Sequence, residues 1–95
     1  MNLEKVNWVR GGKYRATILQ LLQKRPMLPS EVASVLRLSR ASASRILRSM
    51  EREGLIGRTK STTRTVTYFL LKEGKQLLLC LNDFGPVSTE KSAKE

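Results

Sequence analysis

The sequence contains no histidine and only one cysteine, Cys80. It therefore lacks the usual ligands of a zinc site, and Cys80 has no second cysteine for an internal disulfide. Histidine is also the commonest general base, and the acidic residues are scattered rather than paired. A glycine-rich phosphate loop is missing too. These absences predict a protein that is not an enzyme and that holds no metal and no cofactor.

Long apolar runs are also missing. No segment approaches the roughly 20 apolar residues that span a bilayer, and residues 1–15 lack the apolar centre of a signal peptide. We therefore expect a cytoplasmic protein with no membrane partner. Aromatic residues make up only 5% of the chain, which argues against the stacking platforms with which proteins hold RNA or single strands.

Positive charge is what the sequence has in excess. Its 95 residues, enough for one domain, include 18 Lys and Arg against 8 Asp and Glu, a formal net charge of +10. Residues 37–64 hold eight of these cations and two glutamates, a net charge of +6 in under a third of the chain. Such a concentration of charge favours a polyanion as partner.

Residues 30–54 contain two short helical patterns separated by a tight turn around Leu38 and Ser39. In the second pattern, the apolar residues share one helix face: Ala43, Ile46, Leu47 and Met50. Another face combines small and cationic residues: Ala41, Arg45, Arg48 and Arg52. A helix with such a face suits a major groove about 12 Å wide. The pattern is typical of a helix-turn-helix that reads DNA, although a basic helix without a partner would look similar.

The caps of these helices follow from residue chemistry. Ser30 is the expected cap of the short helix over residues 31–37, and Ser39 that of the recognition helix over residues 39–53. Gly54 suits the residue after the helix end, which often has a positive φ.

Another helix is expected before these two, over residues 13–25 and ended by Pro26. The N-terminal arm, residues 1–12, is expected to dock through Trp8, either as a short strand or as a helical turn.

Two β-rich runs follow the recognition helix, residues 55–60 and 65–70, and the polar residues between them predict a hairpin. The last helix, residues 72–84, carries more apolar surface than one contact face needs. We expect a second subunit to cover the excess, although this helix could simply pack on the first one. The tail, residues 85–95, is expected to be disordered. The expected dimer interface comprises Trp8, Leu77, Leu78, Cys80, Leu81 and Phe84.

This order of elements resembles the winged-helix transcriptional regulators of the MarR and ArsR type. The resemblance spans residues 13–81 and rests on two segments, LPSEVASVLRLSRASASRILRSMEREGLI and YFLLKEGKQLLLCL. It implies DNA binding and dimerisation. Leu71 stands where the family usually has a threonine helix cap, and the cysteine pair or histidines of the metal-sensing ArsR members are missing. The small, sensor-free form is similar to winged-helix proteins of archaea and their viruses.

The predicted fold is therefore α+β but mostly α, a winged helix-turn-helix over residues 1–84 with a two-stranded wing and a C-terminal dimerisation helix. The predicted function is a homodimeric regulator of transcription that binds specific double-stranded DNA, associated with the nucleoid, or in the host cytoplasm if the chain is viral. The recognition helix would enter the major groove, and the wing, residues 58–65, would meet the flanking backbone or minor groove. Predicted DNA contacts are Arg40, Ser42, Ser44, Arg45, Arg48, Arg52, Arg58, Lys60 and Arg64.

Two other functions remain open. A non-specific architectural protein would have the same charge, and a winged helix can also serve as a protein-interaction module. An intersubunit disulfide through Cys80 is the alternative to its role as a small apolar residue.

Overall fold

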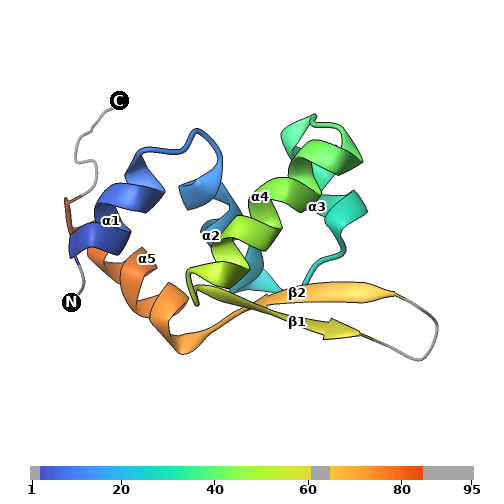
Figure 1. Cartoon of the computed structure of the whole chain (residues 1–95). Helices are drawn as coiled ribbons and strands as arrows, with labels where there is room; N and C mark the ends of the chain where they lie inside the picture. Colours follow the sequence, from blue (N-terminus) through green and yellow to red (C-terminus); the bar gives the residue numbers. More distant parts are fainter. Residues whose placement is uncertain (1–2, 61–64, 85–95) are drawn as a thin grey trace.

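Figure 1 shows the computed structural model, which describes residues 3–60 and 65–84. Within these residues the chain forms five helices and one antiparallel sheet of two strands. Their order is α1 (Leu3–Arg10), α2 (Arg15–Lys24), α3 (Pro29–Leu36), α4 (Arg40–Arg52), β1 (Ile56–Lys60), β2 (Val66–Leu70) and α5 (Lys72–Phe84). The predicted winged-helix order is confirmed, while the tip of the wing and the tail lie outside the described residues.

Helix α4, the predicted recognition helix, begins and ends as its sequence predicts. The Ser39 hydroxyl oxygen accepts a hydrogen bond from the backbone N–H of Ser42 at 3.0 Å, so the Ser39 cap is confirmed. Gly54 has a φ of +78° just after the helix, which is also confirmed. In the turn before α4, Arg37 adopts a left-handed backbone conformation with a φ of +59°, which the sequence did not predict. Together, the turn at Arg37 and the Ser39 cap set the point at which α4 begins, and Gly54 sets the point at which it ends.

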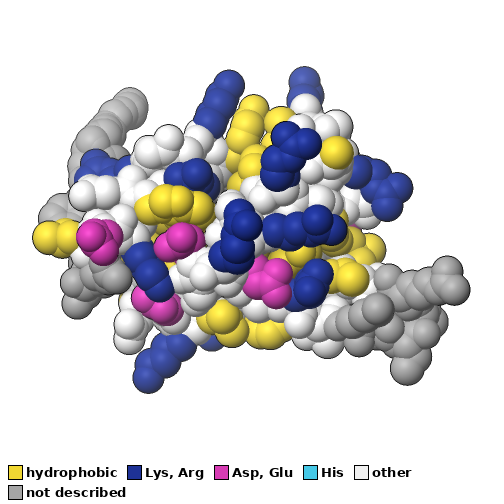
Figure 2. Space-filling model, in the orientation of Figure 1, with side chains coloured by type: hydrophobic (Ala, Val, Ile, Leu, Met, Phe, Trp, Pro, Cys, Tyr) yellow, Lys and Arg dark blue, Asp and Glu magenta, His cyan; other side chains and the backbone are white. Residues whose placement is uncertain are grey.

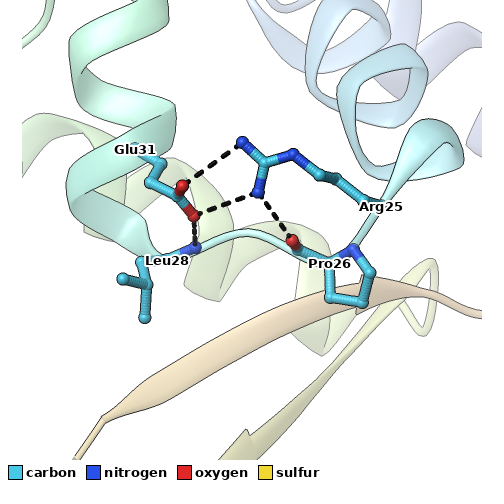
Figure 3. A network of polar contacts seen from close by, with 4 residues as sticks. All are labelled: Arg25, Pro26, Leu28 and Glu31. Carbon is cyan, nitrogen blue, oxygen red and sulfur yellow. Dashed lines mark hydrogen bonds and ion pairs between the residues drawn. The ribbon is translucent and has the colours of Figure 1, made fainter.

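The expected Ser30 cap of α3 is wrong. The helix begins two residues earlier than predicted, at Pro29, with Leu28 as its N-cap. Proline suits the first helical position because its fixed φ is already helical and its missing N–H needs no partner. The carboxylate of Glu31 reaches back and accepts a hydrogen bond from the Leu28 N–H at 2.9 Å (Figure 3). Arg25 holds the same carboxylate from the other side, with Nη2 3.2 Å from Oε2.

Replacement of Glu31 by glutamine is expected to lower stability in a pH-dependent way. The hydrogen bond from Leu28 and the contact with Arg25 lower the pKa of Glu31 in the folded protein. A carboxyl group with a lowered pKa stabilises the fold above its unfolded pKa and loses this contribution as pH falls through the folded value. The unfolding temperature of Glu31→Gln should therefore lie below that of the wild type at about pH 6 and approach it at about pH 3.

Glu53→Gln provides the control, since it removes a carboxylate of equal charge from another helix end. An equal difference between the wild type and Glu31→Gln at both pH values would show that the carboxylate charge does not carry the effect.

The N-terminal arm is a helix, not a strand. Helix α1 buries Val6 and Val9, with 2% and 0% of their surfaces exposed, so these residues anchor it rather than Trp8. Trp8 is half-buried, and the guanidinium of Arg15 stacks on its ring 3.7 Å from the centroid. The arm therefore docks through its valines, and Trp8 helps to join α1 to the start of α2.

The wing is tied to the helix-turn-helix through the segment between α2 and α3. Strands β1 and β2 pair so that Arg58 lies opposite Tyr68. On its other edge, Tyr68 pairs with Met27, with N–H···O distances of 3.0 and 2.8 Å between the two backbones. Both side chains are buried. This pairing gives the base of the wing a fixed position relative to α3 and α4.

Helix α5 lies against α1 and α2 at the end of the molecule away from α3 (Figure 1). The residue before it, Leu71, donates its N–H to the carbonyl oxygen of Leu55 at 3.1 Å. All parts of the described chain contribute to one core: Val6, Val9, Ile18, Leu19, Leu22, Met27, Val32, Ala33, Ala43, Leu47, Met50, Leu55, Ile56, Tyr68, Leu70, Leu77 and Leu78.

Candidate nucleic-acid interface

Helix α4 turns its apolar side into the core and its cations outward. Ala43, Leu47 and Met50 each have 0% of their surface exposed, as their spacing predicts. The opposite side lines a shallow hollow of about 610 Å³ formed by Arg40, Ala41, Ser44, Arg45, Arg48 and Arg52. In Figure 2, Lys and Arg side chains gather over α4, whereas acidic ones lie mostly towards α1 and α5. The outer face of α4 is therefore a strongly positive surface.

A groove of about 370 Å³ separates α4 from the wing. Arg40, Ser44 and Arg48 form its α4 side. The rest of its lining comes from the wing and the start of α3: Leu28, Pro29, Ser30, Arg58, Thr65, Val66 and Tyr68. Three arginines from two different elements thus line one groove, which suits a phosphate backbone.

The side of α4 that faces α2 is more apolar. Its hollow of about 440 Å³ is lined by Tyr14, Arg15, Leu38, Ser42, Arg45, Ile46, Ser49 and Arg52. The guanidinium of Arg15 already has partners within the chain, because it stacks on the Trp8 ring and donates a hydrogen bond to the Trp8 carbonyl oxygen. The hydroxyl of Ser42 is also engaged, 3.0 Å from the Ser39 hydroxyl.

Most of the predicted DNA-contact residues share one side of the molecule. The two hollows and the groove bring together Arg40, Ser42, Ser44, Arg45, Arg48, Arg52 and Arg58. The side chain of Lys60 and the whole of Arg64 lie outside the described part of the structure.

The structure adds Ser30 and Thr65 to the wing-side groove. The sequence could not reveal them, because only tertiary packing brings the start of α3 and the second wing strand beside α4.

The predicted dimer residues lie in different environments. Leu77 and Leu78 are 2% and 1% exposed, since they pack into the core of their own chain. Cys80, Leu81 and Trp8 are partly buried against that core, and the side chain of Phe84 lies outside the described part. The most exposed apolar side chains at this end are Leu3, at 65%, and Leu79, at 60%, and neither is among the predicted interface residues.

Metal clusters and membrane-spanning helices are both absent from the described part of the chain. Residues 3–60 and 65–84 contain no group of three His, Cys, Asp or Glu placed to hold a metal ion. Within the same residues, every helix is too short or too polar to cross a membrane.

The fold is shared with several solved structures. A MarR-family regulator from Enterococcus faecalis V583 has a TM-score of 0.78 and 22% identity, covering 86% of this chain and 77% of its own. MepR of S. aureus, solved with DNA, has a TM-score of 0.74 and 21% identity, covering 84% and 68%. The adhesin competence repressor AdcR of Streptococcus pyogenes has a TM-score of 0.70 and 19% identity, covering 81% of this chain. The present chain spans 59% of the length of AdcR.

The sequence comparisons are more specific. Curated proteins gave no match. The model of the MarR family matches residues 16–63, which hold all of α2 except its first residue, together with α3, α4 and β1. An ArsR relationship and an archaeal or viral origin stay predictions. Since the family match covers half of the chain and the fold agrees with it, the chain belongs to the MarR family, whose members are transcription regulators and not enzymes.

Proposed function

We propose that this protein is a homodimeric transcriptional regulator that binds specific double-stranded DNA through α4. The observation that carries the proposal is the outer face of α4, where Arg40, Arg45, Arg48 and Arg52 surround small residues. Small side chains permit close approach to base edges, and arginine can bond guanine through two parallel hydrogen bonds. In support, the structure of MepR, which has the same fold, was solved with DNA.

Arg45 and Arg48 are the proposed readers of base edges, because both line the hollow of α4 and lie in the interior of the helix, whereas Arg40 and Arg52 are its first and last residues. Ser44 borders the same hollow and is available to bases or phosphates, whereas Ser42 has its hydroxyl in the helix cap. Arg40 in the first turn is assigned to the backbone. The remaining predicted cations are assigned to phosphates on the flanks: Arg52, Arg58, Lys60 and Arg64.

Two subunits would place their α4 helices in successive major grooves, about 10 base pairs apart on a pseudo-palindromic site. Leu3 of α1 and Leu79 of α5 favour an interface at this end, because α1 and α5 pack together and both side chains are exposed. Leu77 and Leu78 are best regarded as supports of that surface, since they are buried in their own chain.

The proposal is tested by measuring affinity and stoichiometry at several salt concentrations. The probes are a duplex selected from a genomic pool, a random duplex and a single-stranded RNA. A preference of at least about 10³ for the selected duplex, with two subunits per site, is expected. Equal and steeply salt-dependent binding to every duplex would favour an architectural role instead. Absence of binding at moderate salt would favour a protein-interaction module.

Arg52→Ala is expected to weaken the selected and the random duplex by the same factor. Arg52 lies in the last turn of α4 and is assigned to a phosphate, which carries no sequence information. Loss of one phosphate contact should also reduce the salt slope by about 1. Lys75→Ala removes the same charge from the exposed side of α5 and should leave the slope unchanged. A selective loss on one duplex would instead place Arg52 on a base.

A further inference from the structure

One acidic side chain lies within the basic surface of α4. Glu51 is on the side of the helix that faces the wing, and its Oε2 is 3.6 Å from Nε of Arg58 on β1. About a third of the Glu51 side chain and half of the Arg58 side chain remain exposed, at 33% and 46%. An ion pair this exposed contributes little to stability. Its geometry suggests another role.

The pair joins the element proposed to enter the major groove to the element proposed to meet the flanking backbone. Arg58 lines the wing-side groove opposite Arg40 and Arg48, so three like charges share this space. Without a counter-charge, mutual repulsion would favour many rotamers of the Arg58 side chain. Glu51 meets Arg58 through Nε, which leaves both Nη groups of the guanidinium available to a second acceptor.

We propose that Glu51 is a positioning residue that sets specificity, because it holds Arg58 in one orientation for a duplex phosphate. The inference rests on the proposed DNA-binding function. On the selected duplex, α4 would bind at one fixed position along the major groove, and the Arg58 side chain oriented by Glu51 would contact a phosphate at that position. On other duplexes, the fixed Arg58 cannot follow a displaced backbone, and the carboxylate repels nearby phosphates. Glu51 would therefore widen the difference in affinity between the selected and random duplexes.

The test is a double-mutant cycle of Glu51→Gln and Arg58→Gln, with affinity measured on selected and random duplexes by fluorescence anisotropy. Glu51→Gln frees Arg58 and removes one negative charge, so binding to random duplex should tighten by about 3- to 10-fold and its salt slope should steepen by about 1. Affinity for the selected duplex should change less than about 2-fold, since the lost orientation offsets the gained attraction. In the Arg58→Gln background, Glu51→Gln should no longer change the ratio of the two affinities.

Two further variants separate position from charge. Glu51→Asp keeps the charge but shortens the reach to Arg58, so it should lower the ratio by weakening the selected duplex. Glu53→Gln removes a carboxylate two residues away that has no contact with Arg58 among the described residues, and it should leave the ratio unchanged. Unfolding curves of all variants should coincide with that of the wild type, so the changes in binding cannot come from loss of the fold.

The outcomes distinguish this inference from the proposed function. If the wild type prefers the selected duplex but the two substitutions act additively, the role of Glu51 is overturned and the function stands. An equal effect of Glu53→Gln also overturns it. If the wild type binds all duplexes alike, both sequence-specific regulation and the specificity role of Glu51 are overturned. Absence of any binding overturns both.

Discussion

Gly74→Ala is expected to destabilise the protein by about 2 kcal/mol and to lower its unfolding temperature by about 10 °C. Gly74 lies in the first turn of α5, where a Cβ would overlap the carbonyl oxygen of Leu55 and lie 2.8 Å from Cδ1 of Leu70. Because the carbonyl belongs to backbone that cannot rotate away, α5 must shift outward. That shift would weaken the hydrogen bond from Leu71 to Leu55. The helix preference of alanine, about 1 kcal/mol over glycine, offsets only part of the overlap.

Urea and thermal unfolding measure this effect, with Gly11→Ala as the matched control. A Cβ at Gly11 would lie 3.3 Å from its nearest neighbour, the carbonyl oxygen of Asn7, so a small adjustment suffices. Gly11→Ala should therefore stay within about 0.5 kcal/mol of the wild type. Equal stability of the two variants would mean that α5 is free to move away from Leu55.

The second large effect concerns Arg48. Arg48→Ala is expected to weaken binding to the selected duplex by about 1–3 kcal/mol, up to roughly 150-fold, with a much smaller loss on random duplex. Arg48 is a strong candidate for a base contact because it lies in the interior of α4, on the face lined by small residues, and not at either end of the helix. Arg45→Ala should behave in the same way at another position of the site. Selection from a randomised duplex pool should show relaxed preference at one base pair for each variant.

Arg48→Lys separates base reading from simple attraction. Lysine keeps the positive charge but not the planar fork that bonds guanine through two donors. The lysine variant should therefore bind random duplex like the wild type and still lose preference for the selected one. Equal losses on both duplexes for Arg48→Ala would assign this arginine to the backbone.

The ends of α4 could be predicted from the sequence, because they depend on interactions between residues that are close together in the chain. Ser39 and Gly54 act on hydrogen bonds and dihedral angles within a few residues of themselves, and both behave as expected. The Ser30 cap failed because a stronger local arrangement was present. Pro29 at the first helical position and Glu31 two residues later form a recognisable helix start.

The orientation of α5 could not be predicted from the sequence in the same way. Leu77, Leu78 and Leu79 are chemically identical, yet two are buried and the third is 60% exposed. Which leucine faces outward depends on how α5 rotates against α1 and α2, and these partners are far away in the sequence. The ion pair between Glu51 and Arg58 could not be predicted for a different reason: the two residues are close in the sequence, but their contact depends on the direction in which the turn at Gly54 sends β1 past the end of α4.

The pairing of Met27 with Tyr68 has a consequence for how the protein folds. It joins two backbones that are far apart in the sequence, and it is buried, so the wing cannot be completed until the helix-turn-helix has packed beneath it. An isolated two-stranded hairpin is only marginally stable in water. The wing should therefore gain and lose its structure together with α3 and α4, as one cooperative unit. The spacing between α4 and the wing, the two elements proposed to face DNA, is then set by global folding rather than by a flexible hinge.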